Sequence, residues 1–379
     1  AEYAVPNMVY GVIVSGRVAK GRIAAIDEAA ARSVPGVVDV LTHLNRPRIA
    51  RRESKHKDEL GIPGDSFKAL EDDRILFSGQ PVALVLAETF EAARFAASLV
   101  DVAYEAEPHN IDFELSLRER FLPSKRRSSY RPHKDRGDAD AAFAEAALRH
   151  EGRYRLATEH HNPMEMHATT VEWHGQGRIT LYDKCQGAQG VQDYVASAFG
   201  FEKEQVRVVN AYVGGAFGSG LRPQYQTQLA VLAAKHLERS VRVVMTRQQM
   251  FTHAHRPEAV YDIKLGAEGS GRLTAMIGEA TTSTSRFEDN MESIVSWGMV
   301  NYASPNARGD YAIAPRDTYT SADMRAPGAA TGMTLFEMAL DELAWEARAD
   351  PLEFRLANYS DIDAMNQRPF TSKALREAY

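Results

Sequence analysis

Strand-like and helix-like segments alternate along most of the chain, which limits the folds it can adopt. Near the start, Pro35-Gly36 marks a turn between two such segments, and Thr89 is the predicted N-cap of a helix. The predicted strands of this part cover residues 12–14, 37–41, 80–87 and 101–105, and the predicted helices cover 26–31 and 89–100. These elements end near Pro108 and predict a small α+β domain.

Residues 116–136 are rich in Arg, Lys, Ser and Pro and lack apolar periodicity, so they predict a linker. Beyond it the alternation resumes, and Asp138 is the N-cap of a predicted helix to Leu148. Further predicted strands cover 150–157, 169–174, 178–183, 206–209 and 241–245, and a predicted hairpin covers 258–267 and 272–284. Predicted helices cover 189–199, 224–238, 331–348 and 351–358, the last with Asp350 as its N-cap. We therefore predict an α+β chain with domains at 1–115 and 137–379.

Composition restricts the classes of function. The net charge of -6 and the pI near 6.1 lack the basic footprint of a nucleic-acid-binding protein. The single cysteine, Cys185, rules out an intramolecular disulfide and cannot supply the thiolates of an iron-sulfur cluster. No apolar run is long enough for a membrane span, and the N-terminus lacks the layout of a signal peptide. We expect a cytoplasmic protein, or a periplasmic one if it is exported together with a signal-bearing partner.

A glycine-rich loop lies between a predicted strand and a predicted helix. Residues 214–220 read Gly-Gly-Ala-Phe-Gly-Ser-Gly, and the bare N–H groups of such a loop can bind an anion or an oxo group. From Gly215 to Gly220 the spacing is that of a phosphate loop, but Leu221 stands in place of the required lysine, and no G-x-G-x-x-G register fits. The spacing argues against nucleotide binding, and the loop read alone is more often an ordinary turn.

Three further features carry chemistry but are ambiguous when each is read alone. Residues 159–167 concentrate three His and two Glu, yet their spacing is not that of a zinc protease, and Pro163 argues against one continuous helix. Hydrogen-bonded polar residues are favoured there over metal ligands, with a zinc hydrolase as the alternative. Arg325 precedes a predicted helix and could bind an anion, although a solvated arginine is the commoner case. Cys185 is more often a small buried side chain than a nucleophile.

The order of these segments resembles one family along the whole chain. The segments are residues 79–93, the Asn-Pro-Met-Glu core of residues 159–167, Gln186-Gly187, residues 214–218 and the Met-Arg-Ala-Pro-Gly of residues 324–328. In this order they resemble the large subunit of molybdenum hydroxylases of the xanthine dehydrogenase and aldehyde oxidoreductase family. The resemblance implies a small N-terminal α/β hammerhead domain (1–115), a linker (116–136) and the first part of a mixed α/β molybdopterin-binding domain (137–379).

The resemblance also implies roles for individual residues. The implied cofactor-binding residues are Gln186 beside the oxo ligand, Gly187, the loop residues Gly215, Ala216 and Phe217, and Arg325 on the pterin side. No side chain of this chain is expected to ligate the metal directly. The implied cofactor is molybdopterin with molybdenum, with the cytosine dinucleotide as a candidate form. The implied partners are subunits that carry 2Fe-2S and FAD, together with a C-terminal molybdopterin-domain part or subunit.

The implied reaction is hydroxylation with water as the oxygen source and a glutamate as the base. Leu221 stands where purine-oxidising members have a glutamate, and Pro327 replaces an aromatic residue, so the implied substrate pocket favours aldehydes over purines. The family's glutamate base follows several hundred residues beyond the arginine segment, so we expect no catalytic residue here and an inactive chain on its own. Glu337 and Glu342 lie on a predicted amphipathic helix and are not assigned as the base. The alternatives are a hydroxylase of purines or other N-heterocycles and a non-catalytic scaffold.

Overall fold

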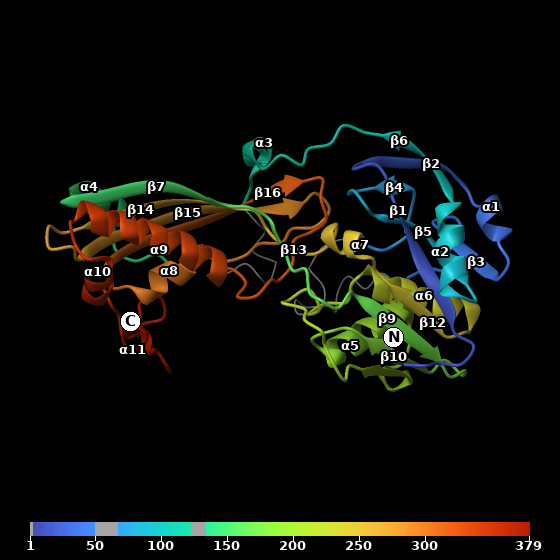
Figure 1. Cartoon of the computed structure of the whole chain (residues 1–379). Helices are drawn as coiled ribbons and strands as arrows, with labels where there is room; N and C mark the ends of the chain where they lie inside the picture. Colours follow the sequence, from blue (N-terminus) through green and yellow to red (C-terminus); the bar gives the residue numbers. More distant parts are fainter. Residues whose placement is uncertain (1–2, 50–66, 123–133) are drawn as a thin grey trace.

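The computed structural model describes residues 3–49, 67–122 and 134–379. Figure 1 shows two lobes, one around a sheet that contains strands from the blue N-terminal part, the other around long strands and the helix α9. The short strand β13 (His255–Arg256) lies between them. Among the described residues, none of the helices is long and apolar enough to cross a membrane.

The first lobe is built on a seven-stranded sheet in the order β11-β10-β9-β12-β1-β5-β3. Its strands are β1 (Val9–Ser15), β3 (Val37–Thr42), β5 (Pro81–Ala87), β9 (Ala168–Trp173), β10 (Ile179–Asp183), β11 (Val206–Val209) and β12 (Val241–Val244). β1 pairs in parallel with β12, so that Val9 lies opposite Val241. The N-terminal strands and the strands after residue 168 therefore share one continuous sheet.

Helices pack against the apolar residues of this sheet, in which all seven residues of β5 are buried. Val171, Leu181 and Val243 are buried in one core cluster with the apolar residues of the helices α5 and α6. The helices of this lobe are α1 (Ala29–Arg32), α2 (Phe90–Ser98), α5 (Ala188–Phe199), α6 (Tyr225–Leu237) and α7 (Arg247–Phe251). A separate three-stranded sheet consists of β2 (Gly21–Asp27), β4 (Arg74–Ile75) and β6 (Asp101–Ala106).

The second lobe contains a four-stranded sheet in the order β16-β15-β14-β7. Its strands are β7 (Leu148–Leu156), β14 (Ala259–Ala267), β15 (Leu273–Ser285) and β16 (Asn306–Arg316). Its helices are α3 (Phe113–Ser116), α4 (Ala139–Glu145), α8 (Val295–Asn301), α9 (Ala329–Glu346), α10 (Pro351–Ala357) and α11 (Leu375–Ala378). Tyr261 and Phe336 belong to the core that α9 forms against the sheet. The short strands β8 (Glu159–His160), β17 (Ile362–Asp363) and β18 (Arg368–Pro369) form two small ladders, β8 with β13 and β17 with β18.

Most predicted elements are confirmed, including the N-caps Thr89, Asp138 and Asp350 and the hairpin of β14 and β15. The helix predicted at 26–31 was wrong, because Ile26 and Asp27 continue β2 opposite β6 and the helix begins only at Ala29. The helix after Asp138 ends at Glu145, since Leu148 already begins β7. Residues 123–133 of the predicted linker lie outside the described part.

Candidate cofactor site

The glycine-rich loop, residues 214–220, connects the region after β11 to α6. Gly218 has a φ of +110°, and a Cβ built on it would lie 2.2 Å from the carbonyl oxygen of Asp323. Only glycine can therefore bring this loop so close to the segment that precedes Arg325. Phe217 has a positive φ of +56° although it carries a side chain, which is a strained conformation typical of functional sites.

Gln186 is joined to this loop through its side-chain oxygen. Its Oε1 accepts hydrogen bonds from the N–H groups of Gly218 at 2.9 Å and Gly220 at 3.2 Å. Its own N–H donates to the carbonyl of Gly220 at 2.7 Å. The side chain is exposed, and Nε2 has no partner within the described part of the chain. The loop thus fixes the acceptor end of the amide and leaves its N–H donors available to a ligand.

The arginine segment, residues 323–328, lies against the same loop. The N–H of Arg325 donates to the carbonyl of Phe217 at 2.8 Å, and its carbonyl accepts from Arg256 Nη2 at 2.8 Å. The guanidinium of Arg325 is exposed and has no ion-pair partner among the described residues. Ala326 has a φ of +55°. The backbone is fixed in a strained conformation while the cation stays free.

Residues 159–167 complete the arrangement. The N–H of Glu165 donates to the Gly214 carbonyl at 3.0 Å, and the N–H of Gly214 donates to Glu165 Oε2 at 2.7 Å. The two ring nitrogens of His161 lie 2.8 Å from the Asp323 carbonyl and 3.2 Å from the Ala254 carbonyl. Within the described ranges, no three His, Cys, Asp or Glu side chains are placed to hold a metal ion. The segment therefore connects the glycine-rich loop to the arginine segment through hydrogen bonds. The zinc-hydrolase alternative lacks a ligand set among these described residues.

Burial dominates the electrostatics behind the loop. It lowers the pKa of His167 to about 2 and that of His253 to about 3, with further lowering by neighbouring cationic groups. Both rings are neutral, and His167 Nδ1 and His253 Nε2 are buried without a hydrogen-bond partner in the described structure. Burial likewise raises the pKa of Glu292 to about 7, although Arg256 and the N–H of Gly328 oppose the shift. Burial raises the pKa of Cys185 to about 12, so its thiol is a packed side chain and not an activated nucleophile.

The remaining predicted site residues lie around this centre. Gly187 is the N-cap of α5, and Gly215 has a φ of +87°. Ala216 is buried, so only its backbone can face a ligand. Leu221 is exposed at the end of the glycine-rich loop, and Pro327 is exposed in the arginine segment. Hydrogen bonds thus join the backbones that carry Gln186, Phe217 and Arg325, whereas no contact between the side chains of Leu221 and Pro327 is described.

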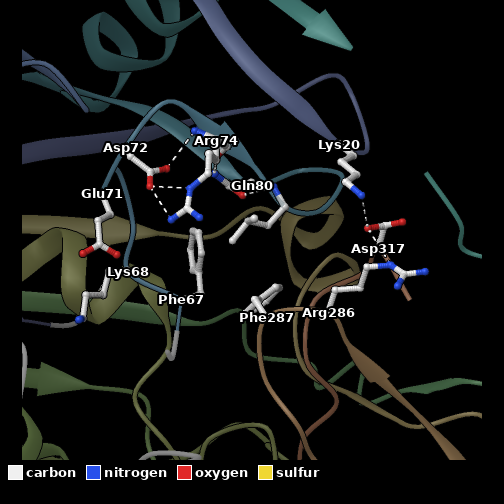
Figure 2. A pocket seen from close by; sticks show the side chains of 11 residues that line it. Lys20, Phe67, Lys68, Glu71, Asp72, Arg74, Gln80, Arg286, Phe287 and Asp317 are labelled. Atoms are coloured by element: carbon white, nitrogen blue, oxygen red, sulfur yellow. Dashed lines mark hydrogen bonds and ion pairs between the residues drawn. The ribbon is translucent and has the colours of Figure 1, made fainter. Parts of the chain in front are cut away.

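A cavity of about 410 Å³ lies elsewhere, at the seam between the lobes (Figure 2). Its charged side chains are largely paired, with Lys20 and Arg286 each 3.3 Å from Asp317 and Arg74 2.7 Å from Asp72. None of the predicted site residues lines it. This cavity therefore lies in a region that the predicted site residues did not indicate.

Comparison with known proteins gives this arrangement a family. Residues 122–359 match the molybdopterin cofactor-binding domain, and residues 1–108 match the a/b hammerhead domain of aldehyde oxidase and xanthine dehydrogenase. The chain belongs to this family. It is 34% identical over 374 residues to the aldehyde oxidoreductase molybdenum-binding subunit PaoC of Escherichia coli O157:H7, covering 98% of this chain and 49% of that protein. It is 27% identical over 391 residues to the xanthine dehydrogenase molybdenum-binding subunit of the same organism, covering 100% and 51%.

Solved structures agree on the fold. Aldehyde oxidoreductase from Desulfovibrio gigas superposes with a TM-score of 0.84 at 24% identity, covering 99% of this chain and 42% of that one. CO dehydrogenase from Oligotropha carboxidovorans gives 0.85 at 20% identity, covering 100% and 51%. The chain spans about half the length of the curated relatives it matches. These likenesses establish the hammerhead and molybdopterin-binding folds, and they do not distinguish the branches of the family.

The residues present fit a molybdopterin cofactor. Glycines permit close approach of the backbone, the Gln186 amide offers free N–H donors, and Arg325 offers an unpaired cation for an anionic group. Arg256, Glu292 and Lys184 are buried around these loops and were not among the predicted site residues. Arg256 and Glu292 occur in no recognisable motif. Lys184 directly follows Asp183 at the end of β10, so nothing in the sequence indicated that its amine is buried.

Proposed function

We propose that this chain supplies one wall of the molybdenum site in a hydroxylase that oxidises aldehydes to carboxylic acids. The observation that carries the proposal is Gln186, whose oxygen is held by the glycine-rich loop while its N–H donors stay free. The relationship to an aldehyde oxidoreductase subunit supports the same reaction class. Aromatic aldehydes are the proposed substrates, and water is the proposed source of oxygen.

The proposed cofactor-binding residues are Gln186, Gly187, Gly215, Ala216, Phe217 and Arg325. The cofactor would supply the redox chemistry. Gln186 would orient it by donating hydrogen bonds, and the exposed Phe217 ring would exclude water from its surface. Arg325 would bind its anionic part. The cytosine dinucleotide form of the pterin is part of this proposal.

Leu221 and Pro327 support an aldehyde substrate. Both are exposed and apolar, so neither offers a hydrogen bond to the polar edge of a purine. If the whole assembly oxidises benzaldehyde but neither xanthine nor hypoxanthine, the proposal of an aldehyde substrate is supported. The reverse preference would favour the alternative, a hydroxylase of purines or other N-heterocycles.

The catalytic base is proposed to come from outside this chain. The carboxylates nearest the glycine-rich loop are engaged, because Glu165 accepts from Gly214 and Asp323 pairs with Arg222 at 3.1 Å. The aldehyde oxidoreductase molybdenum-binding subunit PaoC is about twice as long. We therefore propose a hetero-oligomer with a C-terminal molybdopterin-domain part or subunit, a 2Fe-2S subunit and an FAD subunit, and no activity of this chain alone. The proposed location is the cytoplasm, or the periplasm after export with a partner.

The domain boundaries remain a proposal, with a hammerhead unit at 1–115, a linker at 116–136 and the molybdopterin-binding part from 137 to 379. The seven-stranded sheet contains strands from both proposed domains, so this division separates strands that pair with each other. Because β1 pairs with β12, residues 1–115 expressed alone should expose the edge of β1. We expect that fragment to aggregate unless residues 137–379 are coexpressed.

A conservative variant of Gln186 tests the proposed function. Gln186→Glu keeps acceptor oxygens for Gly218 and Gly220 but removes the N–H donors. We expect little change in unfolding free energy and a fall in aldehyde turnover of roughly 10- to 100-fold, the size of a lost hydrogen bond to a charged group. Molybdenum and pterin content of the purified assembly would be measured in parallel.

The matched control is Gln189→Glu, which makes the same change at an exposed position of α5. It should leave turnover and cofactor content unchanged. Equal turnover in Gln186→Glu and Gln189→Glu would contradict a role for the Gln186 donors. If no preparation of the wild-type assembly contains molybdenum, the alternative of a non-catalytic scaffold is favoured.

A further inference from the structure

A small polar cavity of about 70 Å³ lies beside the start of the glycine-rich loop. Thr170, Tyr182 and Arg242 line it from β9, β10 and β12, and their neighbours Val171, Leu181 and Val243 are buried in the core with α5 and α6. Because side chains alternate along a strand, the cavity lies on the face of the sheet opposite that core. Its volume is several times the roughly 10–15 Å³ that one water requires, so it can hold a small anion but no ring system.

Lys184 is the unusual residue of this cavity. Its side chain is 5% exposed, and its Nζ is buried without a hydrogen-bond partner in the described structure. Glu165 lines the same cavity, but its Oε2 accepts from Gly214 and it forms no ion pair with Lys184 among the described residues. Asp183 Oδ1 accepts from the hydroxyls of Thr169 and Thr227. Lysines are almost never buried unless paired, so this amine calls for a ligand that the described residues do not provide.

A second cation faces the same space. Arg242 donates from Nε to Thr170 Oγ1 at 2.8 Å and from Nη2 to the Tyr3 carbonyl, so its guanidinium is oriented by neutral acceptors and paired with no described carboxylate. Asn210 also lines the cavity, and its buried Oδ1 has no partner in the part of the chain that the structure describes. Its Nδ2 is already engaged with the Cys185 carbonyl. The cavity therefore offers two cationic donors and one acceptor.

We propose that this cavity binds a phosphate group, with Lys184 and Arg242 as donors to its oxygens and Asn210 as acceptor from a P–OH group. A tetrahedral oxyanion presents several acceptor oxygens at once, as two cations from different strands require. Inorganic hydrogen phosphate retains an O–H at neutral pH that Asn210 can accept, whereas an ionised carboxylate would leave Asn210 unsatisfied. Burial lowers the pKa of Lys184 to about 8, although Glu165 acts in the opposite direction, so a bound anion would also stabilise its charged form.

The phosphate could belong to the cofactor or be free in solution, and only the first source rests on the proposed function. Gln186 lies two residues after Lys184, which places the cavity near the proposed cofactor-binding loops. The test uses inorganic phosphate as the probe. Its binding to the purified assembly would be measured by calorimetry, once with protein from cells that cannot make molybdopterin and once with cofactor-loaded protein.

Lys184→Met is the decisive variant. We expect it to weaken phosphate binding by the cofactor-free protein roughly 10- to 100-fold, and Lys184→Arg to retain part of the affinity. Lys264→Met removes a lysine that is paired with Glu151 at 2.8 Å in the other lobe and should bind phosphate like the wild type. Because methionine fills a similar volume without a buried charge, Lys184→Met should melt at or above the wild-type temperature when phosphate is absent.

Each outcome of the calorimetry has one meaning. Binding that depends on Lys184 in cofactor-free protein and vanishes in loaded protein assigns the site to the cofactor's phosphate, and extractable pterin should then fall in Lys184→Met. Binding that depends on Lys184 in both preparations assigns it to free phosphate. Absence of binding in cofactor-free wild type, or equal affinity in wild type and Lys184→Met, overturns the proposal. The phosphate measurement on cofactor-free protein stays valid even if the proposed oxidation of aldehydes is wrong.

Discussion

The four-stranded sheet and the loops around Gln186 satisfy their polar groups in different ways. In the sheet, β14 is hydrogen-bonded along its whole length to both β15 and β7, over a core that includes the fully buried Tyr261. In the loops, Phe217 and Ala326 have positive φ values, and His167 and His253 carry buried ring nitrogens without a described partner. In the sheet, the backbone conformations are unstrained and the backbone of β14 is paired on both sides. In the loops, some backbone conformations are strained and some buried nitrogens have no described partner. Such conflicts mark functional regions, where a ligand can supply the missing interactions.

The largest expected effect is that acid destabilises the loops around Gln186 before it affects the four-stranded sheet. Burial lowers the pKa values of His167 to about 2 and of His253 and His255 to about 3. The neutral rings therefore contribute stability that is present above pH 6.5 and is lost as the pH falls toward their folded-state pKa values. Between pH 8 and pH 6 this loss should be about 0.8 kcal/mol for each histidine and about 2.5 kcal/mol in total. Hydrogen exchange should show lost protection around the loops before it appears in β14 and β15.

His253→Phe would isolate one of these contributions. The new ring can stack on Tyr319, whose centroid lies 5.6 Å from that of His253, and it cannot take up a proton. We expect the loss of unfolding free energy between pH 8 and pH 6, measured by urea unfolding, to be smaller than in the wild type by about 0.8 kcal/mol. His109→Gln, at an exposed position, should retain the full wild-type loss. An unchanged pH dependence in His253→Phe would show that buried histidines do not make the loops sensitive to acid.

A pair of glycine substitutions compares the two regions directly. Gly218→Ala places a Cβ 2.2 Å from the Asp323 carbonyl at a φ of +110°, so it should cost about 2 kcal/mol and lower the bound cofactor. Gly269→Ala, in the turn between β14 and β15, meets no atom within 4 Å and should be close to neutral. Unfolding free energies and molybdenum content would be measured for both. Equal effects of the two substitutions would mean that the loop backbone can adjust and that the contrast is weaker than the geometry indicates.

The sequence predicted the regular elements well because capping and periodicity are local signals. Thr89, Asp138 and Asp350 cap helices as expected. The union of β1 with β12 could not be predicted, since it joins residues more than two hundred positions apart and depends on the shape of both surfaces.

The candidate site was predicted in outline from the order of its motifs, which indicated Gln186, Phe217 and Arg325. The buried partners were not predictable, because Arg256, Glu292 and Lys184 acquire their character only from burial among distant segments. Whether the predicted residues bind the cofactor stays a prediction. The prediction is specific because the two motifs are in direct contact. A hydrogen bond from the N–H of Arg325 to the carbonyl of Phe217 holds the glycine-rich loop against the arginine segment.

Glu292 tests the same contrast in the opposite direction, because its contribution to stability is lost as the pH rises. Its carboxyl accepts from Gly328 N–H at 3.1 Å, and burial raises its pKa to about 7. The protonated form contributes stability that is greatest below pH 4.5 and is lost as the pH rises through 7, so the wild type should lose about 1.4 kcal/mol between pH 6 and pH 8 from this group. Glu292→Gln keeps an acceptor for Gly328 and should abolish that loss in urea titrations at the two pH values. If the change in unfolding free energy between pH 6 and pH 8 is the same in the variant and the wild type, then Glu292 is ionised throughout and pairs with Arg256, whose Nη1 lies 3.9 Å away. In that case the arginine segment would rest on a buried ion pair and would be as fully satisfied as the sheet.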